Sequence, residues 1–119
     1  MQPTLRSMLG LLALVVGVGA AQQWWANRHA DEIGAQVTAL ARPGDIRMIS
    51  SDSCGICASA RSWFKAHNIA YSECSIERDA GCRADFEATR SPGTPVIVVR
   101  GRPYAGFSPE ILRRALTPT

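Results

Sequence analysis

Charge is scarce in this chain of 119 residues, and the shortage is confined to its N-terminal part. Charged residues make up 19% of the sequence, and none occurs at the 21 positions between Arg6 and Arg28. Basic blocks are absent as well, since the 13 basic and 10 acidic residues are dispersed along the chain. A net charge of +3 without a basic stripe does not provide the surface that nucleic-acid binding requires. We therefore expect no nucleic-acid partner.

The sequence also lacks internal repeats, low-complexity tracts and the length for more than one sizeable domain. At 119 residues it is too short for a dinucleotide-binding domain, a P-loop enzyme or a large substrate domain. Apolar residues make up 46% of the chain and recur through its last two thirds, which excludes disorder for most of it. We predict an N-terminal segment over residues 1–27, a helical linker over 28–44 and one small domain over 45–119, which we expect to be monomeric.

The uncharged N-terminal segment contains an unbroken apolar run, Met8–Ala21, behind a short positive leader. Interpreted as a membrane anchor, the run extends to Trp24 and Trp25, whose indole rings suit the membrane–water interface. About 20 residues cross the hydrocarbon core, and the 21 uncharged positions suffice. Interpreted as a cleaved secretory signal, the run ends in small residues such as Gly19 before Gln22. A buried core helix is the third alternative.

Both leading interpretations place the rest of the chain outside the cytoplasm. The length of the run favours the uncleaved anchor, with the membrane as a partner and the domain in the periplasm or another extracytoplasmic space. Cleavage of a signal would instead give a secreted protein.

Residues 26–41 carry apolar side chains at helical spacing, namely Ile33, Val37 and Leu40. The sequence Arg42-Pro43-Gly44 then ends the predicted helix. This pattern fits two arrangements equally well: a stalk that holds the domain away from a membrane, or a helix that packs on its own domain.

The remainder of the sequence alternates between predicted strands and helices. Pro95–Val99 is a continuous, mostly β-branched run, which is typical of a strand buried on both faces. The last helix begins well, because Ser108 can cap it and Pro109 suits its first position. The expected elements are strand 46–49, a helix that begins just after Cys54 and continues through 58–67, strand 70–76, helix 79–89 with apolar support from Ala84, Phe86 and Ala88, strand 95–99, strand 103–105 and a helix from 108 onward.

Three motifs on this element order carry a resemblance to a known family. Cys54-Gly55-Ile56-Cys57 follows the first strand, Thr94-Pro95 precedes the buried strand, and Gly106-Phe107 precedes the last helix. In this arrangement they resemble the glutaredoxin family, the smallest form of the thioredoxin fold, over about residues 45–116. The resemblance implies an α/β, thioredoxin-like fold with a mixed four-stranded sheet flanked by helices, here preceded by the transmembrane or signal helix.

The same resemblance implies an activity and a binding site. The activity is that of a thiol–disulfide oxidoreductase acting on protein or glutathione disulfides, with glutathione as a candidate co-substrate and no bound cofactor or metal. Two departures from the usual family pattern are visible, because Gly55-Ile56 replaces Pro-Tyr and Ser51 stands where the family usually has Lys. Thr94-Pro95 resembles the family's cis-proline. The residues implied in binding substrate or glutathione are Ser51, Gly55, Ile56, Thr94, Pro95, Gly106, Phe107 and Ser108.

Thiolate chemistry gives the two cysteines of the first motif different predicted roles. A position just ahead of a helix directs unpaired backbone N–H groups at the sulfur of Cys54, which favours the thiolate that attacks a disulfide. Cys57, one helical turn later, would resolve the mixed disulfide by attacking Cys54. We predict both as catalytic residues. The alternatives are a membrane-tethered metal-binding and delivery module that uses the same cysteines, and a redox-inert adaptor that presents the groove at Pro95.

Cys74 and Cys82 are not needed for that mechanism. The spacing of the four cysteines does not form two close pairs, which disfavours a four-cysteine metal site. An exported compartment favours a disulfide between Cys74 and Cys82, and the short intervening loop makes ring closure cheap. We predict a structural Cys74–Cys82 disulfide, with two buried free thiols as the alternative in a reducing compartment.

Four charged residues near these elements are predicted to have no catalytic role. Glu73 and Glu77 have no partners arranged for acid–base chemistry, so we expect both side chains to be solvated. Arg100 and Arg102 border a turn and are predicted to be surface residues.

Overall fold

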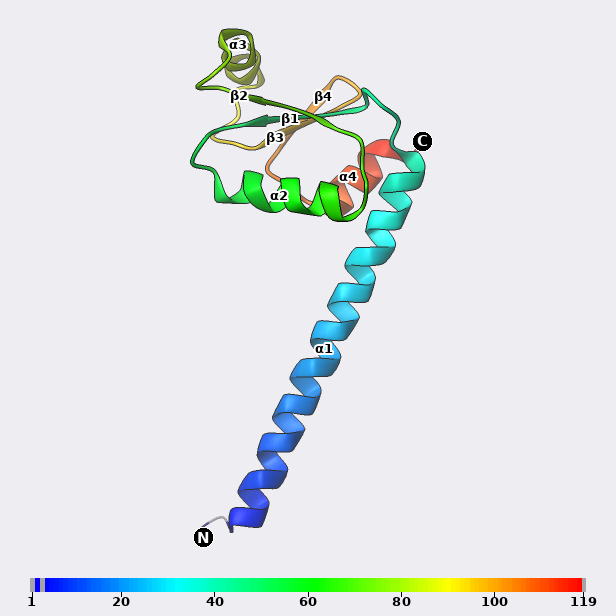
Figure 1. The fold of residues 1–119 in the computed structure, drawn as a ribbon, viewed down its shortest axis with the longest axis vertical. Coiled ribbons are helices and arrows are strands. Elements are labelled where there is room, and N and C mark those ends of the chain that lie inside the picture. The colour runs from blue at the N-terminus through cyan, green and yellow to red at the C-terminus, as the bar shows by residue number, and fades with distance from the viewer. Residues whose placement is uncertain (1, 3, 119) are drawn as a thin grey trace. The chain divides into compact units, whose positions relative to one another are not determined.

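A mixed, four-stranded sheet forms the centre of the domain, as predicted (Figure 1). The computed structural model describes Gln2 and residues 4–118. The strands lie in the order β2-β1-β3-β4, in which β1 is parallel to β2 and antiparallel to β3, and β4 is antiparallel to β3. Their bounds are β1 (Ile46–Ser50), β2 (Ser72–Ser75), β3 (Val96–Val99) and β4 (Arg102–Ala105).

The helices α2 (Gly55–Ala66) and α4 (Pro109–Leu116) cover one face of the sheet. Phe64 of α2 and Leu116 of α4 are fully buried there, in one core cluster with Met48 of β1. Side chains of a strand alternate between the two faces, so Met48 marks the face that these helices cover.

Helix α3 (Ala80–Thr89) covers the opposite face (Figure 1). Its Cys82 is buried in a second, smaller cluster with Ile49 of β1 and Val96 of β3. Because consecutive residues of β3 belong to the two different clusters, β3 is buried on both faces, as its continuous apolar sequence predicted.

Two expected faces differ from those in the structure. On α3, Ala84 and Ala88 are exposed, and the buried side is formed by Cys82 and Phe86, which are four residues apart. Strand β2 is shorter than the predicted strand 70–76, and none of its four residues is fully buried. The difference follows from its place at the edge of the sheet, where it has β1 as its only neighbour.

The helix α1 (Leu5–Leu40) is continuous for 36 residues and contributes to two units of the chain. The first unit ends at Glu32, and its apolar side chains are exposed. It contains a window with a mean hydropathy of 1.6 that is long and apolar enough to cross a membrane, a test that a signal sequence also passes. No part of that window is buried, so the alternative of a buried core helix does not hold.

The second unit begins at Ile33, still within α1. Ile33 and Val37 are buried and belong to the same core cluster as Phe64. The Thr38 hydroxyl donates a hydrogen bond to the carbonyl of His67 at the end of α2 (2.7 Å). Of the two arrangements that the helical pattern allowed, residues 33–40 therefore adopt the one in which the helix packs on its own domain.

Candidate active site

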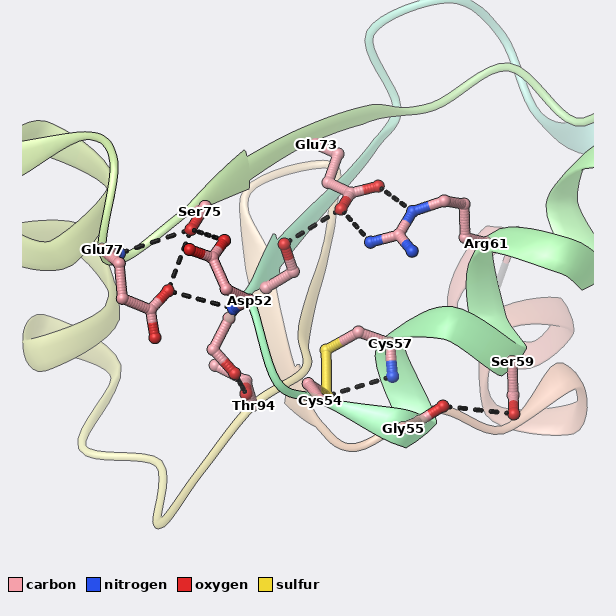
Figure 2. The surroundings of a disulfide bond; sticks show 12 residues. Asp52, Cys54, Gly55, Cys57, Ser59, Arg61, Glu73, Ser75, Glu77 and Thr94 are labelled. Carbon is pink, nitrogen blue, oxygen red and sulfur yellow. Dashed lines mark hydrogen bonds and ion pairs between the residues drawn. A yellow bond between two sulfur atoms is a disulfide. The ribbon is translucent and has the colours of Figure 1, made fainter.

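Cys54 is the residue at which α2 starts. Its backbone is extended (φ −100°, ψ 108°), and its Sγ accepts a hydrogen bond from the Cys57 N–H (3.0 Å). Cys54 is thus the N-cap of the helix, which begins at Gly55, so the prediction that Cys54 lies just ahead of a helix is confirmed. The structure joins Cys54 and Cys57 in a disulfide, with Cα atoms 5.2 Å apart (Figure 2).

The two sulfurs of this pair differ in their access to solvent. Cys54 is half-buried, whereas Cys57 is completely buried in the larger core cluster. An incoming disulfide therefore meets Cys54 first. The free N–H groups and positive dipole end of α2 also favour a negative charge on the Cys54 sulfur. The arrangement has the asymmetry that an attacking and a resolving cysteine need.

The two residues between the cysteines lie on the open side of the site. Ile56 is 56% exposed, which is unusual for a large apolar residue. At Gly55, a Cβ atom would meet nothing within 4 Å. The space beside Gly55 that a side chain would occupy is therefore open.

The Thr94–Pro95 peptide bond is cis. The hydroxyl oxygens of Thr94 and Ser51 are hydrogen-bonded at 2.6 Å, so the loop before Cys54 is joined to the segment before β3. Pro95 is buried, and its carbonyl accepts a hydrogen bond from the N–H of Gly106 (2.9 Å). The structure therefore brings together the loop at Ser51, the Thr94–Pro95 segment and Gly106.

Gly106, Phe107 and Ser108 have three distinct local roles. Gly106 has φ +80°, a conformation that favours glycine. The ring of Phe107 packs towards the core, with its centroid 5.6 Å from that of Trp63 and 5.6 Å from that of Phe64. Ser108 is the N-cap of α4 and accepts a hydrogen bond from the Ile111 N–H. Whether these residues contact a substrate stays a prediction.

Glu73 is exposed, as predicted, but its carboxylate also forms an ion pair with Arg61 beside the Cys54–Cys57 disulfide (Figure 2). Arg61 of α2 donates two hydrogen bonds to its carboxylate, the one from Nε at 2.9 Å, and the buried Ser50 hydroxyl lies 3.0 Å from Oε2. Arg61 and then Ser50 hold the pKa of Glu73 below its ordinary value, against the opposing effect of burial. Glu73 in turn raises the pKa of Arg61. Burial raises the pKa of the neighbouring Tyr71.

A second polar group surrounds Asp52, two residues before Cys54. The Ser75 hydroxyl lies 3.0 Å from Asp52 Oδ1 and 2.9 Å from Glu77 Oε2, and the Asp52 N–H donates to the same Glu77 oxygen (3.1 Å). Arg78 forms an ion pair with Asp52 at 3.1 Å. Glu77 is exposed, as predicted, but its carboxylate accepts a hydrogen bond from the loop that leads to Cys54.

Cys74 and Cys82 form a second disulfide, with Cα atoms 6.0 Å apart. It joins the edge strand β2 to the start of α3, where the Asp79 carboxylate accepts a hydrogen bond from the Cys82 N–H (3.0 Å). Arg47 Nη2 lies 3.2 Å from Cys74 Sγ, and its Nη1 is paired with Asp85 (2.7 Å). In the part of the chain that the structure describes, no three Cys, His, Asp or Glu side chains converge as metal ligands.

Comparisons with known proteins agree with this fold and motif. The glutaredoxin family model matches residues 46–103. A mutant of the thioredoxin-like protein BC3987 shares 30% identity over 61% of this chain and 95% of that chain, with a TM-score of 0.56. A second structure of BC3987 also has 30% identity, over 60% of this chain and 99% of that one, with a TM-score of 0.53.

A mutated buckwheat glutaredoxin shares 13% identity over 76% of this chain and 92% of its own, with a TM-score of 0.50, and shows similarity of fold alone. The search of curated proteins gave no match. The family model matches residues 46–103, and the chain covers 95% of a thioredoxin-like structure at 30% identity. The chain therefore belongs to the thioredoxin-like proteins and carries a glutaredoxin domain.

Proposed function

We propose that this chain is a thiol–disulfide oxidoreductase that uses Cys54 as nucleophile and Cys57 as resolving cysteine on protein or glutathione disulfides. The observation that carries the proposal is the position of Cys54, half-exposed at the N-terminus of α2 with its sulfur accepting the Cys57 N–H. The buried Cys57 sulfur lies within bonding distance of Cys54, as the disulfide between them requires.

The reaction transfers two electrons through a mixed disulfide. The Cys54 thiolate attacks one sulfur of a substrate disulfide, forms a Cys54–substrate bond and releases the other substrate sulfur as a thiolate, which takes up a proton. Cys57 loses its proton and attacks Cys54, which forms the intramolecular disulfide and releases the second substrate thiol. The substrate disulfide is thereby reduced to two thiols, and the Cys54–Cys57 dithiol is oxidised. The reverse sequence oxidises a substrate dithiol.

The surface around Cys54 supports an extended thiol substrate. Ile56 offers exposed apolar contact area beside the sulfur, and Thr94 lies next to the same loop through its bond to Ser51. The N-terminus of α4 at Ser108 is suited to a carboxylate such as those of glutathione. We therefore keep glutathione and protein cysteines as the proposed partners.

The N-terminal unit supports a location at a membrane, with the domain on the extracytoplasmic side. Its exposed apolar helix has the length of a membrane span, and the ring of Trp24 stacks with the Arg28 guanidinium (4.7 Å), a pair suited to an interface. The Cys74–Cys82 disulfide suits an oxidising compartment. The alternative proposal is a secreted domain released by signal cleavage.

Substitution of the two cysteines tests the proposed activity. Cys54→Ser removes the nucleophile and should abolish reduction of a disulfide substrate, whereas Cys57→Ser should still attack it and accumulate a mixed disulfide that mass spectrometry detects. Ser59→Ala is the matched control, because Ser59 lies on the same helix and its hydroxyl contacts the Gly55 carbonyl instead of a sulfur (3.3 Å). The role assignment is wrong if Cys57 is the thiol that reacts with an alkylating agent at neutral pH.

A further inference from the structure

The end of β2 is hydrogen-bonded to the loop that leads into Cys54 and Cys57, which we call the redox pair. We name residues 73–77 the clasp segment and residues 50–53 the redox loop. The Ser50 hydroxyl lies 3.0 Å from a carboxylate oxygen of Glu73 and 3.0 Å from the carbonyl of Cys74, and the Ile76 N–H donates to the Ser50 carbonyl (3.0 Å). Ser50 is only 2% exposed, so these contacts satisfy a buried hydroxyl.

The clasp segment also holds the middle of the redox loop. Ser75 lies within hydrogen-bond distance of the Asp52 carboxylate, and the Asp52 N–H donates to the Glu77 carboxylate (Figure 2). The clasp segment therefore contacts Asp52 at two points, the side-chain carboxylate and the backbone N–H. Two residues after Asp52, the chain reaches Cys54 and α2 begins.

The Cys74–Cys82 disulfide adds a covalent link from the clasp segment to α3, beside the parallel pairing of β2 with β1. Strand β2 is four residues long and lies at the edge of the sheet, so β1 is its only strand partner. Cys82, by contrast, is 1% exposed and lies in the core cluster under α3. The disulfide therefore links an edge segment covalently to a well-packed helix, at the residue between the Glu73 and Ser75 contacts.

We propose that the Cys74–Cys82 disulfide is a positioning device for the redox pair: through the clasp segment it holds the redox loop so that Cys54 remains the N-cap of α2. This inference rests on the proposed function. When the disulfide is absent, the clasp segment separates from the redox loop more often, and the loop no longer fixes Cys54 over the N–H groups of α2. The Cys54 thiol then becomes less acidic and attacks disulfides more slowly.

The test compares the full-length chain with the variant Cys74→Ala/Cys82→Ala. Each protein is treated with a limiting reductant to open Cys54–Cys57, and peptide mapping verifies that Cys74–Cys82 remains closed in the parent chain. Two quantities are measured: the second-order rate of reaction with bis(2-hydroxyethyl) disulfide, which is uncharged, and the pH dependence of Cys54 alkylation. We expect the rate to fall about fivefold, the factor of a typical N-cap interaction, and the alkylation midpoint to move to higher pH.

Two further variants separate positioning from general destabilisation. Phe86→Ala removes packing from the same small cluster and keeps both disulfides, so it should lower the unfolding temperature and leave the alkylation midpoint unchanged. Ser75→Ala keeps both disulfides and the core but removes a clasp contact, so it should move the midpoint in the same direction as the double variant.

Each outcome decides something specific. An alkylation midpoint in the double variant equal to that of the parent chain would overturn the inference. If the double variant does not fold, the same result in Ser75→Ala would overturn it. A shift in Phe86→Ala as large as that in the double variant would also overturn it. Failure of the parent chain to react with any disulfide would contradict the proposed function instead, while the alkylation profiles would still test the positioning role.

Discussion

Two glycines of the candidate site would respond differently to an added methyl group. Gly106 has φ +80° and donates its N–H to the Pro95 carbonyl, so its backbone conformation is tied to the Thr94–Pro95 segment. Gly55 does not have a positive φ, and the position of its absent Cβ is surrounded by open space. The backbone conformation at position 106 therefore requires glycine, whereas the folded structure can accept a side chain at position 55.

Gly106→Ala is expected to lower the free energy of unfolding by about 1–2 kcal/mol, because an L-residue is strained at positive φ. Thermal unfolding of the variant and its parent measures the loss. Gly55→Ala is the matched control and should unfold at or slightly above the temperature of the parent, since Ala is the better helix former. Equal losses in the two variants would contradict this account.

The Glu73 carboxylate gives a second prediction at the scale of a residue. Its pKa in the folded state lies below the ordinary value of 4.5, mainly because Arg61 donates to it. The stabilisation is therefore fully present above pH 4.5 and is lost as the pH falls through the lowered pKa. Glu73→Gln should reduce the unfolding temperature at pH 7, and its difference from the parent should shrink as the pH is lowered through the depressed pKa of Glu73, where the parent's carboxyl takes up a proton.

The control for Glu73→Gln is Glu87→Gln on α3. Glu87 forms an exposed ion pair with Arg83, four residues earlier, and such pairs contribute little. The Glu87 variant should follow the parent across the same pH range. A stability loss in the Glu73 variant that does not shrink as the pH is lowered would show that the ion pair is not the cause.

At the scale of the elements, Arg100 joins the ends of several of them. Its guanidinium donates to the carbonyl of Leu116 at the end of α4 (3.3 Å), to that of Leu40 at the end of α1 (3.5 Å) and to the Asp45 carboxylate before β1 (3.2 Å). The Arg42 N–H and then Arg100 hold the pKa of Asp45 below its ordinary value. Arg100 was expected to be a surface residue, and its side chain is indeed 43% exposed, but its polar end holds these three elements together.

Arg100→Ala should lower the free energy of unfolding by about 1 kcal/mol, the usual contribution of such hydrogen bonds, and the unfolding temperature by about 5 °C. Arg102→Ala, at an exposed position of the same turn, is the matched control and should stay within about 0.5 kcal/mol of the parent. Indistinguishable unfolding curves for the two variants would show that Arg100 does not join the elements energetically.

The order of these elements could be predicted from the sequence because each depends on a local pattern. The β-branched run 95–99 needed no partner to be recognised as a buried strand, and Ser108 and Pro109 marked the start of α4 by their own chemistry. The start of α2 just after Cys54 was also predicted, from the cysteine motif that follows the first strand, although cysteine is not among the residues usually preferred as N-cap.

The contacts around the redox pair could not be predicted in the same way. Ser50 and Glu73 are 23 residues apart, and Arg100 and Leu40 are 60 apart, so neither pair produces a local pattern. Glu73 is exposed as expected, but its contacts with Arg61 and Ser50 could not be predicted, because these partners approach it only when β2 pairs with β1 in parallel register. The register of a sheet sets these contacts, and only the structure supplies that register.

At the scale of the whole molecule, one helix serves two units with opposite requirements. Up to Glu32, the apolar side chains of α1 are exposed and suit a lipid environment or a signal sequence. From Ile33 onward, the same helix supplies Ile33 and Val37 to the domain core, where they are 6% and 0% exposed. The folded domain therefore includes the end of α1 and is larger than its sheet and remaining helices.

Two truncations test this division of α1. The full-length chain should fractionate with membranes and resist extraction by high salt, as its apolar helix predicts. A chain starting at Ile33 lacks the exposed apolar unit, so it should be soluble and unfold cooperatively near the temperature of the parent domain.

A chain starting at Asp45 also lacks Ile33 and Val37, whose burial contributes about 3–6 kcal/mol together. That loss is comparable to the whole stability of a small domain, about 5–15 kcal/mol. The shorter chain should therefore unfold at a much lower temperature or not fold at all, which circular dichroism during heating measures. Equal unfolding temperatures for the two truncations would show that residues 33–40 do not belong to the domain core.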